Sequence, residues 1–147
     1  MFRSIVVGTD GSETAGEAVR QATELAGAVG AKVNLVSAFQ PVGNQRLREE
    51  RQQVPDDAQW MVNEREDVDA TLRDARDRAK EAGVEVETFS RQGDPADAIL
   101  DVAEEQGADL IIVGNKGMSG AKRFLLGSVP NKVSHHAPCS VMIIRTT

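Results

Sequence analysis

Short apolar segments alternate with helical patterns along most of the chain. Residues 5–7 and 110–113 are continuous runs of Ile, Val and Leu, as expected of strands that are buried on both faces of a sheet. Residues 32–39 and 140–145 predict two more strands. Residues 84–87 alternate Val with Glu, which is typical of a strand exposed on one side, near a sheet edge. The pattern therefore predicts five strands.

Helical periodicity fills the gaps between these strands. Apolar residues recur at helical spacing in three segments that each end at a glycine, a common helix terminator, and a fourth helix is expected over residues 128–136. Thr14 and Glu17 have the spacing of a capping box, and Asp94 followed by Pro95 is a strong helix start. Alternating strands and helices predict one open, parallel α/β domain over residues 1–147, with helices on both faces of a Rossmann-like sheet.

Residues 40–63 interrupt this alternation. Pro41, Gly43 and Pro55 surround a charged run over residues 46–51, and Trp60 follows. We interpret this part as an exposed, variable insertion or a frayed helix within the single domain.

The composition narrows the class of protein. With 40% hydrophobic and 27% charged residues, the 147-residue chain is expected to fold as one globular domain. No apolar run approaches the ~18 residues that a membrane helix needs. We expect no leader before the first strand, and the single cysteine, Cys139, excludes an internal disulfide. We therefore expect a cytoplasmic protein without a membrane partner.

The charge is uneven along the chain. A net charge of −6 argues against a partner that is a nucleic acid. From residue 114 to the end, however, there is no acidic residue, and the basic residues are Lys116, Lys122, Arg123, Lys132 and Arg145. This cationic part of an acidic protein predicts a local site for a small anion.

The loop after residues 110–113 carries the most informative chemistry. It reads GNKGMSGAKRFLLGS and opens at the carboxyl end of a central strand, where ligands bind in parallel sheets. Its glycines let a phosphate approach the backbone, and Gly127 and Ser128 begin a helix whose free N–H groups favour anions. The sequence therefore predicts a phosphate site.

The pattern GxxG, nine residues, then GS resembles the nucleotide-binding signature of the universal stress protein family. The opening VVGTDGS, the block GDPADAILDVAEEQGADLIIVGNKG and the closing LLGSVPNKVSHHAPCSVMIIR are similar to that family as well. The resemblance covers nearly the whole chain outside residues 40–63. It implies the strand order 3-2-1-4-5, binding of an adenine nucleotide, and a homodimer.

Carried over residue by residue, the resemblance implies a complete nucleotide site. Asp10 is expected near the ribose or a metal–phosphate group, where Mg²⁺ would accompany ATP, and Ala38 is expected to meet adenine through its backbone. The full set of nucleotide-binding residues is Gly8, Thr9, Asp10, Ala38, Val113, Gly114, Lys116, Gly117, Gly127, Ser128 and Val129. The last strand is expected to pair with its counterpart in a second copy through Val141, Ile143 and Ile144.

Pro130 departs from the family's pattern. It stands where many members carry a residue with an N–H group, and proline has none. One phosphate contact is therefore missing, so AMP and cyclic AMP stand as alternatives to ATP, which is the first choice.

Three other functions stay open. The sequence contains no evident set of nucleophile, base and orienting residue, so we expect regulatory binding without efficient turnover, with slow ATP hydrolysis or autophosphorylation as an alternative. A phosphoacceptor receiver domain is a second alternative. It needs clustered carboxylates after the first strand, where Asp10 stands alone. It also needs an acceptor Asp after the third strand, which here ends in Phe89-Ser90-Arg91. A dimeric interaction module without a ligand is the third alternative, against which the intact glycine spacing argues.

Overall fold

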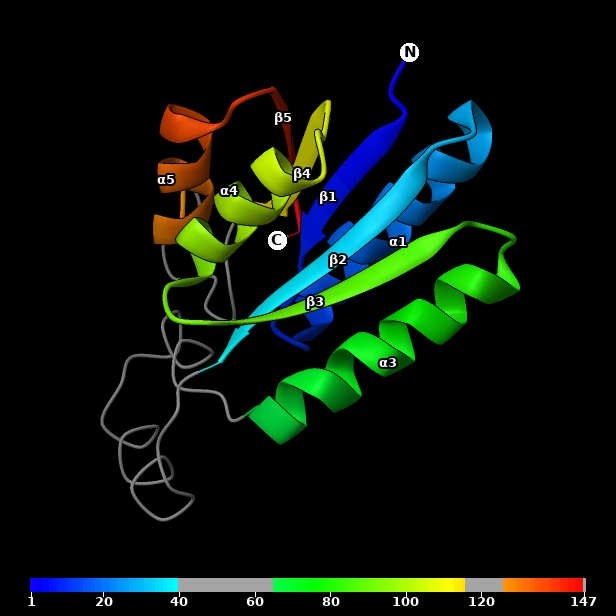
Figure 1. Ribbon diagram of the computed structural model, residues 1–147, viewed down its shortest axis with the longest axis horizontal. Helices are drawn as coiled ribbons and strands as arrows, with labels where there is room; N and C mark the ends of the chain where they lie inside the picture. Colours follow the sequence, from blue (N-terminus) through cyan, green and yellow to red (C-terminus); the bar gives the residue numbers. More distant parts are fainter. Residues whose placement is uncertain (40–64, 116–125, 147) are drawn as a thin grey trace.

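The computed structural model describes residues 1–39, 65–115 and 126–146 (Figure 1). Within this part, strands and helices alternate along the chain. Their bounds are β1 (Ser4–Gly8), α1 (Glu13–Val29), β2 (Lys32–Phe39), α3 (Arg65–Glu81), β3 (Val86–Gln92), α4 (Pro95–Glu105), β4 (Leu110–Gly114), α5 (Ser128–His136) and β5 (Ser140–Ile144). The segment predicted to be an insertion, with Trp60, and the predicted site residues Lys116 and Gly117 lie outside the described residues.

The five strands form one parallel sheet in the order β3-β2-β1-β4-β5. β1 lies at its centre, with Ile5 opposite Val33 of β2 on one side and opposite Leu110 of β4 on the other. This confirms the α/β fold and the strand order that the family resemblance implied. It also places β3 at an edge of the sheet, as its alternating pattern predicted.

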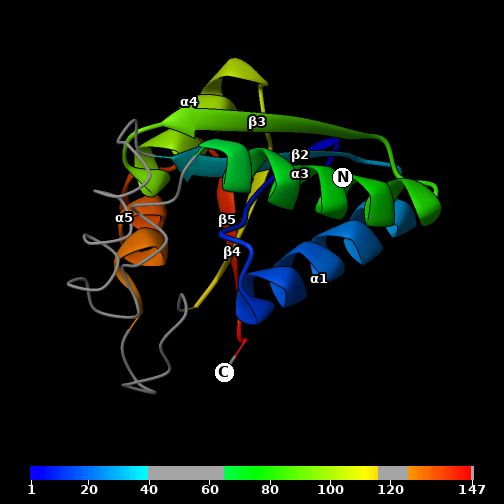
Figure 2. The ribbon, with the colours of Figure 1, turned by 90° about the horizontal axis from the view of Figure 1, so that it is seen from below.

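Helices cover both faces of the sheet (Figures 1 and 2). α1 and α3 pack on the face that carries Ile5 and Val7, and α4 and α5 pack on the face that carries Val6. All three residues are fully buried, which explains why β1 is apolar throughout its middle. Within the described residues, no helix is both long and apolar enough to cross a bilayer.

α1 begins differently from the prediction. Ser12 is its N-cap, and the Ser12 hydroxyl accepts a hydrogen bond from the Ala15 N–H at 3.2 Å. Glu17 pairs instead with Arg20, one turn further along the helix. The predicted capping box between Thr14 and Glu17 is therefore wrong, because a hydroxyl in the preceding turn already satisfies the helix start.

The predicted start of α4 and the predicted end of α1 are confirmed. Asp94 caps α4 by accepting the Asp97 N–H at 3.0 Å, and Pro95 occupies the first turn. Gly30 ends α1 in the left-handed conformation, with φ of 74°. These are local signals that need no distant contact to act.

Candidate functional site

The two loops that the sequence singled out leave the sheet at the same edge. Gly8 ends β1 and Gly114 ends β4, and these two strands are parallel neighbours. The sheet order changes direction here, because β1 connects to β2 on one side while β4 lies on the other. Such a switch point is where open parallel sheets bind ligands.

The turn from β1 to α1 is held by its own polar side chains. The Thr9 hydroxyl, in a side chain that is 4% exposed, accepts the Gly11 N–H at 3.2 Å. Asp10 Oδ1 accepts the Ser12 N–H at 2.8 Å. The other Asp10 oxygen makes no hydrogen bond with a described residue. Asp10 therefore has one oxygen engaged in the turn and one available at the edge of the sheet.

α5 begins without a side-chain cap. Gly127 is its N-cap, and the Gly127 N–H donates to the Asn115 carbonyl at 2.9 Å. The Asn131 N–H bonds back to the Gly127 carbonyl at 3.1 Å. Between them, the N–H groups of Ser128 and Val129 have no partner among the described residues. Two adjacent donors at the positive end of a helix are therefore available to an anion.

Asn115 is a residue that sequence reasoning missed. Its backbone N–H donates to the Ile144 carbonyl at 2.9 Å, and its carbonyl accepts from Gly127. Its side-chain Oδ1 accepts from the backbone N–H of Thr146 at 2.8 Å and from the Thr146 hydroxyl at 3.1 Å. Asn115 thus ties the end of β4 to the start of α5 and to the chain after β5. The sequence showed it only as a spacer inside GxxG.

The apolar residues of the predicted site lie in or against the core. Ala38 is 1% exposed and Val113 is 4% exposed, and both belong to the core under α4 and α5. Val129 is partly buried against the same core. Ala38 can therefore reach a ligand only through its backbone, in the manner expected for adenine.

The cationic part of the chain is less available than its composition suggested. Lys132 lies 2.8 Å from an Asp97 carboxylate oxygen and 3.4 Å from one of Asp94, so it links α5 to the start of α4. The hydrogen bond with Asp97 is the main reason that the pKa of Lys132 is raised. Lys132 is thus a structural cation, and Lys122 and Arg123 lie outside the described residues.

Metal-binding groups are sparse in the part of the chain that the structure describes. No group of three or more His, Cys, Asp or Glu side chains there is arranged to hold an ion. Asp10 supplies a carboxylate from the β1–α1 turn, and the start of α5 supplies the backbone N–H groups of Ser128 and Val129.

Comparison with known proteins gives one family. The model of the universal stress protein family matches residues 1–145. Universal stress protein Rv1636 of Mycobacterium tuberculosis is 39% identical, covering 99% of this chain and 98% of the relative. Universal stress protein MJ0531 of Methanocaldococcus jannaschii is 33% identical, covering 99% of this chain and 83% of the relative.

Solved structures agree with the sequence relatives. A universal stress protein in complex with cAMP is 36% identical, with a TM-score of 0.72 over 99% of this chain and 98% of that one. A universal stress protein from Archaeoglobus fulgidus in complex with dAMP is 28% identical, with a TM-score of 0.68 over 97% and 98%. With this fold, this strand order and these relatives, the chain belongs to the universal stress protein family.

Proposed function

We propose that this protein is a regulatory stress-response protein that binds an adenine nucleotide at the carboxyl edge of β1 and β4. The observation that carries the proposal is the start of α5, where Ser128 and Val129 offer two backbone N–H groups beside the end of β4. Two relatives in the family, 36% and 28% identical, have been solved with cAMP and with dAMP. Both of those ligands are adenine nucleotides with a single phosphate group.

The phosphate is proposed to lie at the start of α5. The Ser128 and Val129 N–H groups donate to it, and Gly127 leaves room because it has no Cβ. The Ser128 hydroxyl adds a third donor. Lys116 and Gly117 are proposed to contact the phosphates from the preceding loop.

The nucleoside is proposed to lie across the ends of the central strands. Adenine contacts the backbone of Ala38, and a ribose hydroxyl donates a hydrogen bond to the free Asp10 oxygen. Val113 and Gly114 flank the ring and the sugar. Gly8 and Thr9 complete the wall on the β1 side. With ATP, Asp10 would share Mg²⁺ with the phosphates, which would have to supply further ligands.

The donor set favours a single phosphate. Pro130 follows Val129 in the first turn of α5 and has no N–H, so the described helix start presents two backbone donors rather than three. AMP or cyclic AMP needs no more than this. ATP, the first choice from the resemblance, would need the additional contacts proposed for Lys116 and Gly117.

We also propose that two copies pair through β5, an edge strand. Met142 and Ile143 are 37% and 38% exposed, which is high for large apolar side chains. Ile144, expected at the interface, is 9% exposed because it packs into the core under α1. An edge strand with exposed apolar residues is a natural surface for pairing with a second copy.

The location and the chemistry complete the proposal. We place the protein in the cytoplasm, where a lone thiol stays reduced; burial raises the pKa of Cys139 and keeps it protonated. We propose binding without efficient turnover. Slow hydrolysis is checked by measuring phosphate release from ATP in the presence of Mg²⁺.

The first test identifies what the protein carries. Gently purified protein is heat-denatured, and released small molecules are identified by mass spectrometry. The protein is then titrated with ATP, ADP, AMP and cyclic AMP. We expect Gly127→Val to weaken binding by about tenfold or more, because a side chain at the N-cap displaces the phosphate from its donors.

The matched control is Gly16→Val, which adds the same side chain to α1 at a position with open space around it. We expect this variant to bind like the wild type. If the wild type binds none of the four nucleotides at millimolar concentration, the proposal fails, and a dimeric interaction module becomes the better account.

A further inference from the structure

α3 contacts the turn that carries Asp10. A Cβ built on Gly11 would lie 3.0 Å from Thr71 Oγ1 and 3.3 Å from Thr71 Cγ2. Gly11 adopts φ of +82°, a conformation that residues with side chains rarely take. The Thr71 side chain therefore lies so close to the Gly11 backbone that a side chain at position 11 would crowd it.

The side-chain hydrogen bonds of this turn are local, whereas the backbone N–H of Thr9 donates to the Val36 carbonyl of β2 at 2.9 Å and ties the start of the turn to the sheet. Thr9 bonds to Gly11, Asp10 to Ser12, and Ser12 to Ala15, each spanning two or three residues. The local bonds preserve the shape of the turn, and the bond from Thr9 to Val36 fixes where it starts. Beyond Thr9, the contact between Gly11 and Thr71 comes from another element, α3.

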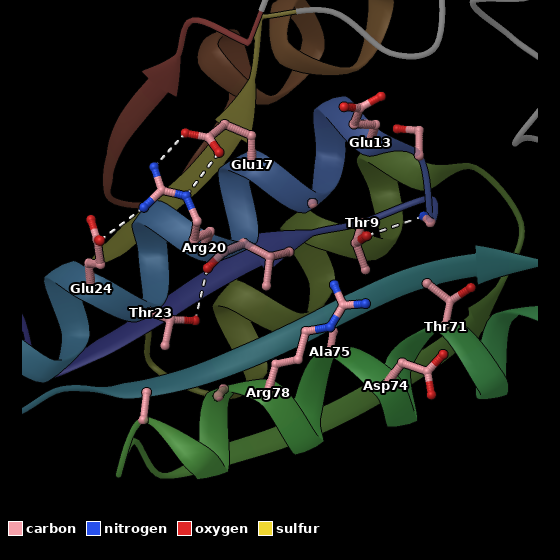
Figure 3. Close-up of a pocket in the computed structure, with 16 residues that line it drawn as sticks. Thr9, Glu13, Glu17, Arg20, Thr23, Glu24, Thr71, Asp74, Ala75 and Arg78 are labelled. Atoms are coloured by element: carbon pink, nitrogen blue, oxygen red, sulfur yellow. Dashed lines mark hydrogen bonds and ion pairs between the residues drawn. The ribbon is translucent and has the colours of Figure 1, made fainter.

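Thr71 is well anchored for this role. Val68 and Leu72, which flank it on α3, are 2% and 3% exposed and lie in the core under α1 and α3. Thr71 and Gly11 both line a cavity of about 620 Å³ between α1 and α3, and Figure 3 shows Thr71 at the end of this cavity near the β1–α1 turn. The position of Thr71 is thus coupled to the hydrophobic core rather than to solvent.

We propose that Thr71 is a positioning residue for the nucleotide. Its side chain supports Gly11 and so holds the β1–α1 turn at the position where Asp10 meets the ribose or the metal–phosphate group. The inference rests on the proposed function. It extends the site to α3, which contributes none of the residues that the family signature predicts.

The test compares three variants by titration with cyclic AMP and AMP. Thr71→Ala removes the contact, whereas Thr71→Val keeps its shape. We expect Thr71→Ala to weaken binding by about threefold to tenfold, the loss that corresponds to one weakened hydrogen bond from the nucleotide to the Asp10 carboxylate. Thr71→Val should bind close to the wild-type value. The matched control is Thr23→Ala, since Thr23 lines the opposite end of the same cavity and bonds to the Val19 carbonyl (Figure 3).

A second readout separates positioning from a general loss of structure. In amide NMR spectra without nucleotide, Thr71→Ala should shift the signals of Gly11 and Ser12, and Thr23→Ala should leave them in place. If Thr71→Ala fails to fold, Thr71→Ser provides a milder variant that keeps the oxygen and lacks Cγ2.

Two failures are distinguishable. If the wild type and Thr71→Ala bind equally well while Gly127→Val binds weakly, the role of Thr71 is overturned and the proposed function stands. If the wild type binds no nucleotide, the proposed function is overturned, and the role of Thr71 falls with it.

Discussion

Gly8 at the end of β1 lies directly against Ile99 of α4. A Cβ on Gly8 would stand 2.5 Å from Ile99 Cδ1 and 3.1 Å from Cγ1, and Ile99 is 2% exposed. The resemblance assigned Gly8 to the nucleotide, but this contact gives the glycine a packing role of its own. α4 approaches the central strand closely because no side chain separates them.

This contact predicts an energetic coupling between Gly8 and Ile99. Gly8→Ala should lower the free energy of unfolding by about 1–3 kcal/mol through overpacking. Ile99→Val removes the clashing Cδ1 and should cost about 0.5–1.5 kcal/mol by itself. The free energy of unfolding lost in the double variant should be smaller than the sum of the losses in the two single variants, as measured by urea unfolding. Strict additivity would show that α4 moves away freely and that Gly8 has no packing role.

Asp109 links the start of β4 to the N-terminal segment. Its carboxylate accepts the Arg3 N–H at 2.9 Å and the Ser4 N–H at 3.1 Å. Burial favours the neutral acid, but the hydrogen bonds from these backbone groups outweigh it, so the pKa lies below its ordinary value of 3.8. The stabilisation is therefore present above pH 3.8 and is lost as the pH falls through the lowered pKa.

We expect Asp109→Asn to lower the free energy of unfolding by about 1 kcal/mol at neutral pH. The difference from the wild type should shrink as the pH falls below 3.8, as measured by chemical unfolding at several pH values. Asp101→Asn, at an exposed position on α4, is the matched control and should change little. A difference that stays constant down to acid pH would contradict a role for the ionised carboxylate.

The edge strand β5 predicts how the protein assembles. Ile143→Lys places a charge on an exposed apolar position of this strand and should convert a dimer into a monomer. The mass in solution, from light scattering after size exclusion, is the measurement. Gln92→Lys adds the same charge to the opposite edge strand, β3, and should leave the mass unchanged. A wild type that is monomeric at all concentrations would remove the proposed interface.

Pro130 predicts a preference among nucleotides. Pro130→Ala restores a backbone N–H in the first turn of α5, next to the free N–H groups of Ser128 and Val129. If the phosphates lie at this helix start, ATP should bind about threefold to tenfold more tightly, and AMP should gain less. Calorimetric titration of both nucleotides gives the ratio. An equal gain for both would indicate that the new N–H faces the phosphate common to them.

The start of α5, where we propose the phosphate, could be predicted because its signals are local. The glycine spacing from Gly114 to Gly127 and the serine after it mark the start of α5 without reference to any distant residue. The partners of the polar groups around this helix start were not predictable in this way. Asn115 takes the Gly127 N–H, and Lys132 is held by Asp97, through contacts that depend on how β4, α4 and α5 pack.

The sequence by itself determined which segments form helices and strands, and which strands are buried on both faces. Periodicity separates helices from strands, and the apolar runs at residues 5–7 and 110–113 require coverage on both faces. Only the tertiary structure decided which polar groups are engaged and which have no partner among the described residues. The engagement of Lys132 and the placement of Thr71 beside Gly11 both join residues far apart in the chain. Sequence patterns report local preferences, whereas such contacts exist only once the helices have packed against the sheet.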